Sequence, residues 1–144
     1  MPEPGRTNIV TCDQNGRVAL FDIQEGKGNL KETILETGKR FSRELPACPT
    51  MVFDREGHDA NFFFEMVENE IPFVTWQKNV NKSELESFGD ECWSMSFEFN
   101  GKEYAVFEKD KVFTVEREEK DVSFSLRRIF IWNKSSRRKT CALA

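Results

Sequence analysis

The segment from residue 50 to residue 78 constrains the fold most, because two short apolar runs flank a helical pattern with only brief connections. The runs 50–54 and 72–78 have the length and the β-rich composition of strands. Between them Asp59 is a candidate N-cap, and the helical face that follows is formed by Phe63, Met66, Val67 and Ile71. A strand, a helix and a strand connected this closely predict a right-handed parallel crossover unit.

This unit would place Asp54 at the carboxyl end of a parallel strand, the edge at which open α/β sheets bind ligands. A carboxylate at the end of a buried strand costs desolvation free energy unless a cation or hydrogen-bond donors meet it. The residues leave two explanations open. Asp54 either pairs with Arg55 or caps the turn, or it holds a metal ion. Glu56 either orients ligands or is solvated, and His58 is expected to cap the turn rather than to act as a base.

The residues before this unit predict a hairpin and a helix. Two β-rich runs, 8–12 and 17–23, flank Asn15-Gly16, a dipeptide typical of tight hairpins. The helix is expected to begin after Asn29, to place Leu30, Ile34, Phe41 and Leu45 on one face, and to end before Pro46. This helix is expected to lie on the sheet.

After residue 79 the pattern changes to alternating apolar and polar residues. Turn signals occur at Asn100-Gly101, at Lys109-Asp110 and near Asn133, which predicts a small antiparallel sheet. The fold class is therefore α/β: a mixed sheet with helices in residues 1–79, followed by a β-rich antiparallel subdomain in residues 80–144. The boundary is expected in the polar stretch 78–90.

Composition and charge limit the kinds of partner. No window approaches the roughly 20 apolar residues of a membrane span, and the first ten residues lack the features of a signal peptide, so we expect a cytoplasmic protein without a membrane partner. The four cysteines form no Cys-x-x-Cys pair. Residues 122–144 hold six Lys or Arg and no acid, although the net charge of the chain is −4. This end is either a local contact surface for nucleic acid or simply solvated.

The segment MVFDREGHDANFFFEMVENEIPFVTWQKN, residues 51–79, resembles the region around the second catalytic aspartate of insertion-sequence DDE transposases with an Asp-Arg-Glu signature. The stretch PEPGR, followed by the Asn-Gly hairpin, is similar to the beginning of their ribonuclease H-like core. The resemblance implies that residues 1–79 are part of such a core and that residues 80–144 are the β-rich insertion of this branch. It places the first catalytic aspartate upstream of the hairpin and the catalytic glutamate beyond residue 144, outside this sequence.

The resemblance also implies a chemistry. These enzymes cleave and join DNA by phosphoryl transfer with two Mg²⁺ ions, and Asp54 would be a catalytic residue and metal ligand, with Arg55 and Glu56 beside it. Because Asp54 would be the one of the three metal ligands that this sequence contains, we expect the chain to be inactive alone and not to bind Mg²⁺ tightly. The expected partners are transposon ends and target DNA, and a homodimer of the complete enzyme stays open. The rival hypothesis is a noncatalytic DNA- or protein-binding module with the same fold. The candidate DNA-binding residues are Lys78, Arg127, Arg128, Arg137, Arg138, Lys139, Trp93 and Trp132.

Overall fold

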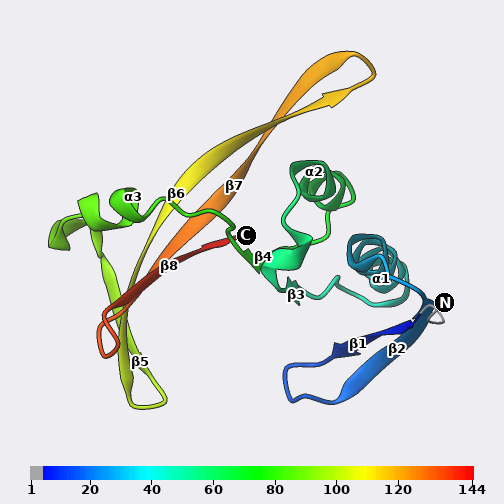
Figure 1. Ribbon diagram of the computed structural model, residues 1–144, viewed down its shortest axis with the longest axis horizontal. Coiled ribbons are helices and arrows are strands. Elements are labelled where there is room, and N and C mark those ends of the chain that lie inside the picture. The colour runs from blue at the N-terminus through cyan, green and yellow to red at the C-terminus, as the bar shows by residue number, and fades with distance from the viewer. Residues whose placement is uncertain (1–4) are drawn as a thin grey trace.

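A computed structural model describes residues 5–144 as a mixed α/β chain, which confirms the predicted fold class at that level (Figure 1). Residues 2–4 of the stretch Pro2–Arg6 lie outside the described residues. The helices are α1 Leu30–Glu44, α2 Ala60–Glu68 and α3 Lys82–Ser87, and 3₁₀ turns span Arg55–Gly57 and Asp90–Cys92. The strands are β1 Arg6–Cys12, β2 Val18–Glu25, β3 Met51–Phe53, β4 Phe73–Trp76, β5 Met95–Phe99, β6 Lys102–Arg117, β7 Lys120–Asn133 and β8 Arg138–Leu143.

The first two strands form the predicted hairpin, slightly longer than expected. The strands pair antiparallel from Arg6 opposite Glu25, and the turn is closed by the Asp13 carboxylate, which accepts hydrogen bonds from two backbone N–H groups. Gly16 in this turn has a φ of 77°, a conformation that glycine adopts without strain. The hairpin is a sheet of its own and lies apart from the six-stranded sheet (Figure 1).

The parallel strand pair and the helix of the crossover unit are also confirmed, and its right-handedness stays a prediction. β3 and β4 pair in parallel, with Met51 opposite Phe73, and α2 connects them. The Asp59 carboxylate caps α2 by accepting hydrogen bonds from the N–H groups of Asn61 and Phe62. The prediction that Val67 belongs to the buried face of this helix was wrong, because Val67 lies next to its last residue and is 41% exposed.

The main core lies between this unit and the long strands. Phe63 and Met66 of α2 are fully buried, and they share a hydrophobic cluster with Ile34 of α1 and Leu143 of β8. α1 contacts α2 and the 3₁₀ turn Arg55–Gly57, so its predicted position on the sheet stays a prediction. Gly38 allows the close approach of α1, since a Cβ atom there would lie 2.8 Å from the Ile71 side chain.

A single six-stranded sheet joins the two ranges that the sequence pattern separated at residue 79. Its order is β3-β4-β8-β7-β6-β5, and only the β3–β4 pair is parallel. The connection between the two parts is the antiparallel pairing of β4 with β8, in which Thr75 lies opposite Leu143 and Trp76 opposite Ala142. The last strand of the chain therefore meets the crossover unit.

The turn predicted at Lys109-Asp110 was wrong. β6 continues through both residues, which pair with Arg128 and Arg127 of β7. The strand reverses instead at Glu118 and Glu119, whose φ angles are 50° and 62°. Tight turns with positive φ usually contain Asn-Gly or Asp-Gly, and two glutamates are unusual there. The sequence therefore contained no signal for a turn at this position. The predicted turns at Asn100-Gly101 and after Asn133 are present.

The polar stretch expected to be a boundary contains α3, capped by the Asn81 side chain. Glu84 on this helix accepts two hydrogen bonds from the Arg128 guanidinium at 2.8 and 2.9 Å, and Gln77 accepts a third at 2.8 Å. The Arg128 side chain is only 11% exposed. These hydrogen bonds hold the pKa of Glu84 below its usual value.

We predict that Glu84→Gln lowers the free energy of unfolding at neutral pH by about 1 to 3 kcal/mol, because it leaves an enclosed guanidinium without its carboxylate. A carboxyl group with a lowered pKa stabilises the fold above its ordinary pKa of 4.5, and this contribution is lost as the pH falls through the lower folded-state value. The difference between the variant and the parent chain should therefore shrink in acid. Urea unfolding at several pH values measures this.

The matched control is Glu86→Gln on the same helix, whose ion pair with Lys82 is long, at 3.7 Å, and exposed. We expect it to change the free energy of unfolding by about 0.5 kcal/mol or less. Equal effects of the two substitutions would show that the Glu84–Arg128 pair does not hold α3 to the sheet.

Candidate functional site

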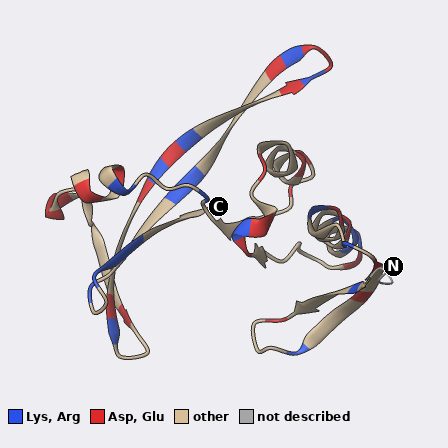
Figure 2. Cartoon of the chain, in the orientation of Figure 1, with Lys and Arg blue, Asp and Glu red and all other residues tan. Residues whose placement is uncertain are grey.

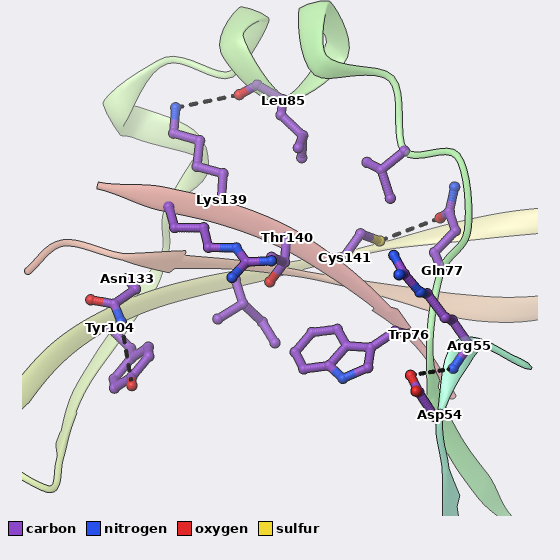
Figure 3. Close-up of a pocket in the computed structure, with 13 residues that line it drawn as sticks. Asp54, Arg55, Trp76, Gln77, Leu85, Tyr104, Asn133, Lys139, Thr140 and Cys141 are labelled. Atoms are coloured by element: carbon purple, nitrogen blue, oxygen red, sulfur yellow. Dashed lines mark hydrogen bonds between the residues drawn. The ribbon is translucent and has the colours of Figure 1, made fainter. Parts of the chain in front are cut away.

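The carboxyl ends of the two parallel strands, β3 and β4, lead into the same groove. Asp54 follows β3 directly, and Trp76 is the last residue of β4. The groove has a volume of about 650 Å³, and Figure 3 shows the residues around it. It is lined by Asp54, Arg55, Trp76, Gln77, Val80, Leu85, Tyr104, Ile131, Asn133, Arg138, Lys139, Thr140 and Cys141.

The groove exists because β8 extends beyond the carboxyl end of β4. Trp76, the last residue of β4, lies opposite Ala142, so the first residues of β8 have no partner in β4. After Trp76 the chain makes one more backbone hydrogen bond to β8, from the Gln77 N–H to the Cys141 carbonyl at 2.9 Å, and then leaves toward α3. β8 begins at Arg138, so residues 138–140 have no strand neighbour on this side within the described chain. The edge of β8 thus forms one wall of the groove, and the ends of β3 and β4 form the other.

Asp54 lies exposed at the mouth of the groove. Its carboxylate accepts a hydrogen bond from the Arg55 backbone N–H at 2.7 Å and caps the 3₁₀ turn Arg55–Gly57. The ion pairs of residues 5–144 do not include one between Asp54 and the Arg55 guanidinium. The assumption of a buried strand was wrong, because Val52 in β3 is 77% exposed. Asp54 therefore has no large desolvation cost to offset.

Three residues that the sequence analysis selected do not line the groove: Glu56, His58 and Lys78. Glu56 is exposed on the 3₁₀ turn, and the backbone N–H of Lys78 donates to His58 Nδ1 at 3.4 Å. His58 ends the turn through its own N–H, as predicted, and its ring packs edge-on against Phe63. Burial, with Lys111 and Lys78 nearby, lowers the pKa of His58. This favours the neutral imidazole that accepts the hydrogen bond.

Arg138 and Lys139 line the groove, and Arg137 precedes them at the β7–β8 turn. Figure 2 shows this basic run along β8. Arg137 and Arg138 are exposed, whereas Lys139 is half-buried and its amine donates to the Leu85 carbonyl at 3.3 Å. The structure thus brings the basic end of the chain to the same groove as Asp54 and Arg55.

Arg127 and Arg128 do not line the groove. Arg127 forms an exposed ion pair with Glu108 at 3.3 Å. The Arg128 guanidinium donates to Glu84 and Gln77, which joins β7 to α3. Nothing in the local sequence distinguishes Arg128 from its neighbours, because its partners lie more than forty residues away.

Trp93 and Trp132 pack together, with ring centroids 5.5 Å apart, and the Lys139 amine lies over both rings at 5.4 and 5.0 Å. Trp93 also packs edge-on against Phe107, in the second hydrophobic cluster.

The sequence analysis did not select Trp76, which lines the groove. A signal was available, because the alternation in FVTW places Phe73 and Thr75 on the core face and Trp76 on the other.

The donor set of the groove offers little to a metal ion by itself. Asp54 is the one carboxylate among its lining residues, and the described residues contain no group of three or more His, Cys, Asp or Glu placed to hold a metal. Mg²⁺ prefers several oxygen ligands in octahedral geometry. The residues present therefore do not make up a magnesium site, although Asp54 can contribute one ligand to a larger one.

Comparison with family models, with curated proteins and with solved structures finds no match to this chain. Of the helices in residues 5–144, none combines the length and the apolar character that crossing a membrane requires. The site must therefore be interpreted from its own geometry: one exposed carboxylate, one exposed indole and a basic sheet edge.

We predict that Asp54→Asn changes the free energy of unfolding by less than about 0.5 kcal/mol, because asparagine caps a turn almost as well as aspartate does. Asp54→Ala, which removes the cap, should cost about 0.5 to 1 kcal/mol. Urea unfolding at neutral pH measures both. A loss of about 3 kcal/mol for Asp54→Asn would mean that Asp54 belongs to a buried ion pair.

The matched control is Asp59→Asn. Asp59 caps α2 and also accepts a hydrogen bond from the Lys31 amine at 2.7 Å, which holds the pKa of Asp59 below its usual value. Removing this charge should cost more stability than removing the charge of Asp54.

Proposed function

We propose that this chain is part of the catalytic domain of a DDE transposase, which cleaves and joins DNA. The observation that carries the proposal is the position of Asp54. This residue belongs to the Asp-Arg-Glu motif and lies at the carboxyl end of a parallel strand, where it faces a groove with basic walls. Open α/β sheets bind ligands at the carboxyl ends of their strands, and basic side chains beside a carboxylate there suit a bound phosphate backbone.

The order of elements supports the proposal. A hairpin, a helix, a strand ending at Asp54, a second helix and a parallel strand follow one another, and a run of antiparallel strands comes next. We assign the first part, through residue 79, to an incomplete ribonuclease H-like core. The β-rich part is then the insertion subdomain, and its last strand closes the groove beside the core.

The exposed apolar surface of the first part supports an incomplete core. Val10, Phe21 and Ile23 share one face of the hairpin and are 48%, 57% and 54% exposed. β3 has no neighbour in the described chain on the side away from β4. A further strand between the hairpin and β3 would pair the backbone donors and acceptors of this open edge, and a segment packed on the face of the hairpin would bury its half-exposed apolar side chains. We propose that the complete core provides this strand.

In the complete enzyme Asp54 would hold Mg²⁺ together with carboxylates from outside this chain, and bound Mg²⁺ would supply Lewis-acid chemistry for phosphoryl transfer. The residues of this chain have the task of holding the DNA. Arg55 and Arg138 can donate hydrogen bonds to phosphate oxygens from opposite walls of the groove. With a single carboxylate, the chain alone is not expected to cleave DNA.

A second candidate function is a noncatalytic DNA-binding module. The observation that favours it is the charge of the groove, whose charged lining residues are three cations and one carboxylate. Phosphate contacts need only clustered cationic donors, and such contacts alone would bind DNA with little regard to sequence.

Cleavage by a longer chain separates the two functions. We predict that a protein comprising residues 1–144 and the sequence that flanks them in the gene nicks DNA carrying the element's ends in Mg²⁺. Asp54→Asn should reduce this cleavage about 100- to 1,000-fold while leaving the melting temperature and DNA affinity nearly unchanged, because only the charge that holds the cation is lost.

Asp13→Asn is the matched control, since Asp13 is an exposed carboxylate in the hairpin turn and does not line the groove. The longer protein with Asp13→Asn should cleave this DNA as fast as the parent protein does. DNA binding without any metal-dependent cleavage would favour the noncatalytic module. Cleavage that survives Asp54→Asn would contradict the role of Asp54.

A further inference from the structure

Trp76 is the residue of the groove that the proposed chemistry leaves unused. It is 45% exposed at the end of β4, and Figure 3 shows its indole inside the groove, near Asp54 and Arg55. No aromatic ring or cation of residues 5–144 stacks on it, in contrast to Trp93 and Trp132, which Lys139 covers. An indole left open in this way keeps a flat apolar face available to a ligand.

The charges around Trp76 indicate the chemistry of that ligand. Arg55 and Arg138 also line the groove, and neither belongs to the ion pairs of the described chain. Lys139 adds a third positive charge, although its amine is already committed to Leu85. A ligand that suits the groove is therefore an anion with several charges and a flat ring.

The open edge of β8 adds the backbone N–H of Lys139 to these side chains, because Arg138 and Thr140 pair with β7. Residues 138–140 line the groove and have no strand neighbour there in residues 5–144. An aromatic face beside guanidinium groups is the combination that binds single-stranded nucleic acid, with a base on the ring and phosphates on the cationic donors. A base in an intact duplex is stacked on its neighbours and cannot lie on an indole at the same time.

We propose that Trp76 is a base-stacking subsite, which binds one unpaired nucleotide of single-stranded DNA while Arg55 and Arg138 hold the adjoining phosphates. This inference rests on the proposed function for the choice of DNA as the ligand. It places an unpaired nucleotide next to Asp54, so the groove favours DNA that is opened at the point of reaction.

The test uses the 144-residue chain and two fluorescein-labelled probes, an oligothymidine of about 12 nucleotides and a duplex of equal length, with binding followed by anisotropy. The parent chain should bind the single strand more tightly than the duplex. Trp76→Leu should weaken single-strand binding roughly 5- to 100-fold and leave duplex binding within about twofold. Trp76→Phe retains an aromatic face and should bind the single strand nearly as well as the parent chain.

Two controls accompany these variants. Leucine and phenylalanine both keep an apolar side chain at the end of β4, and thermal unfolding checks that both variants fold. Phe99→Ala removes an exposed aromatic residue, 61% exposed on β5, that does not line the groove, and it should not change single-strand binding. Arg138→Ala should weaken binding to both probes and reduce the slope of log affinity against log salt concentration by about 1.

The outcomes separate this inference from the proposed function. If Trp76→Leu and Trp76→Phe both bind the single strand like the parent chain while Arg138→Ala weakens both probes, the stacking subsite is wrong and the DNA-binding groove stands. If the parent chain binds neither probe at low salt, both are wrong, and a protein partner becomes the occupant to seek. Equal losses for leucine and phenylalanine would also overturn the inference, because stacking needs only a π face.

Discussion

The pairing of β4 with β8 is the interaction on which the rest of the structure depends. It has only two register pairs, Thr75 with Leu143 and Trp76 with Ala142, yet it joins the parallel crossover unit to the long antiparallel strands. The main core reinforces it, because Leu143 is fully buried against the residues of α2. The short length of β4 matters as much as the pairing. Because β4 ends at Trp76, the edge of β8 stays open and a groove forms beside Asp54.

The environment of Asp54 determines which role the geometry supports. Asp54 is exposed and caps a turn, a task that asparagine performs almost as well, so stability gives no reason for an aspartate rather than an asparagine at this position. Its neighbours in the groove are cations, which attract a polyanion and hold it near the carboxylate. A complete catalytic site would add carboxylates to this arrangement, and the open edge of β3 and the apolar face of the hairpin are where more of the core would pack.

Local signals in the sequence predicted the local structure well. Asn15-Gly16 marked the hairpin, Asn29 and Asp59 marked the helix starts, and the apolar runs around α2 marked the parallel unit. The failures have long-range causes. The sequence did not reveal that Lys109 and Asp110 continue a strand, because their partners are on β7. It could not show that Glu84 binds Arg128, or that Trp76 and Arg138 line one groove, because the pairing of β4 with β8 brings these parts of the chain together.

Photochemical cross-linking tests most directly whether the groove is the DNA-binding site. A single-stranded oligonucleotide carrying iodouracil would be irradiated with the 144-residue chain, and the attached peptides would be identified by mass spectrometry. The account predicts cross-links at Trp76 and within residues 138–140, which lie in the same groove although more than sixty positions separate them in the sequence. Cross-links confined to α1 or to the β6–β7 turn, with none at Trp76, would contradict it.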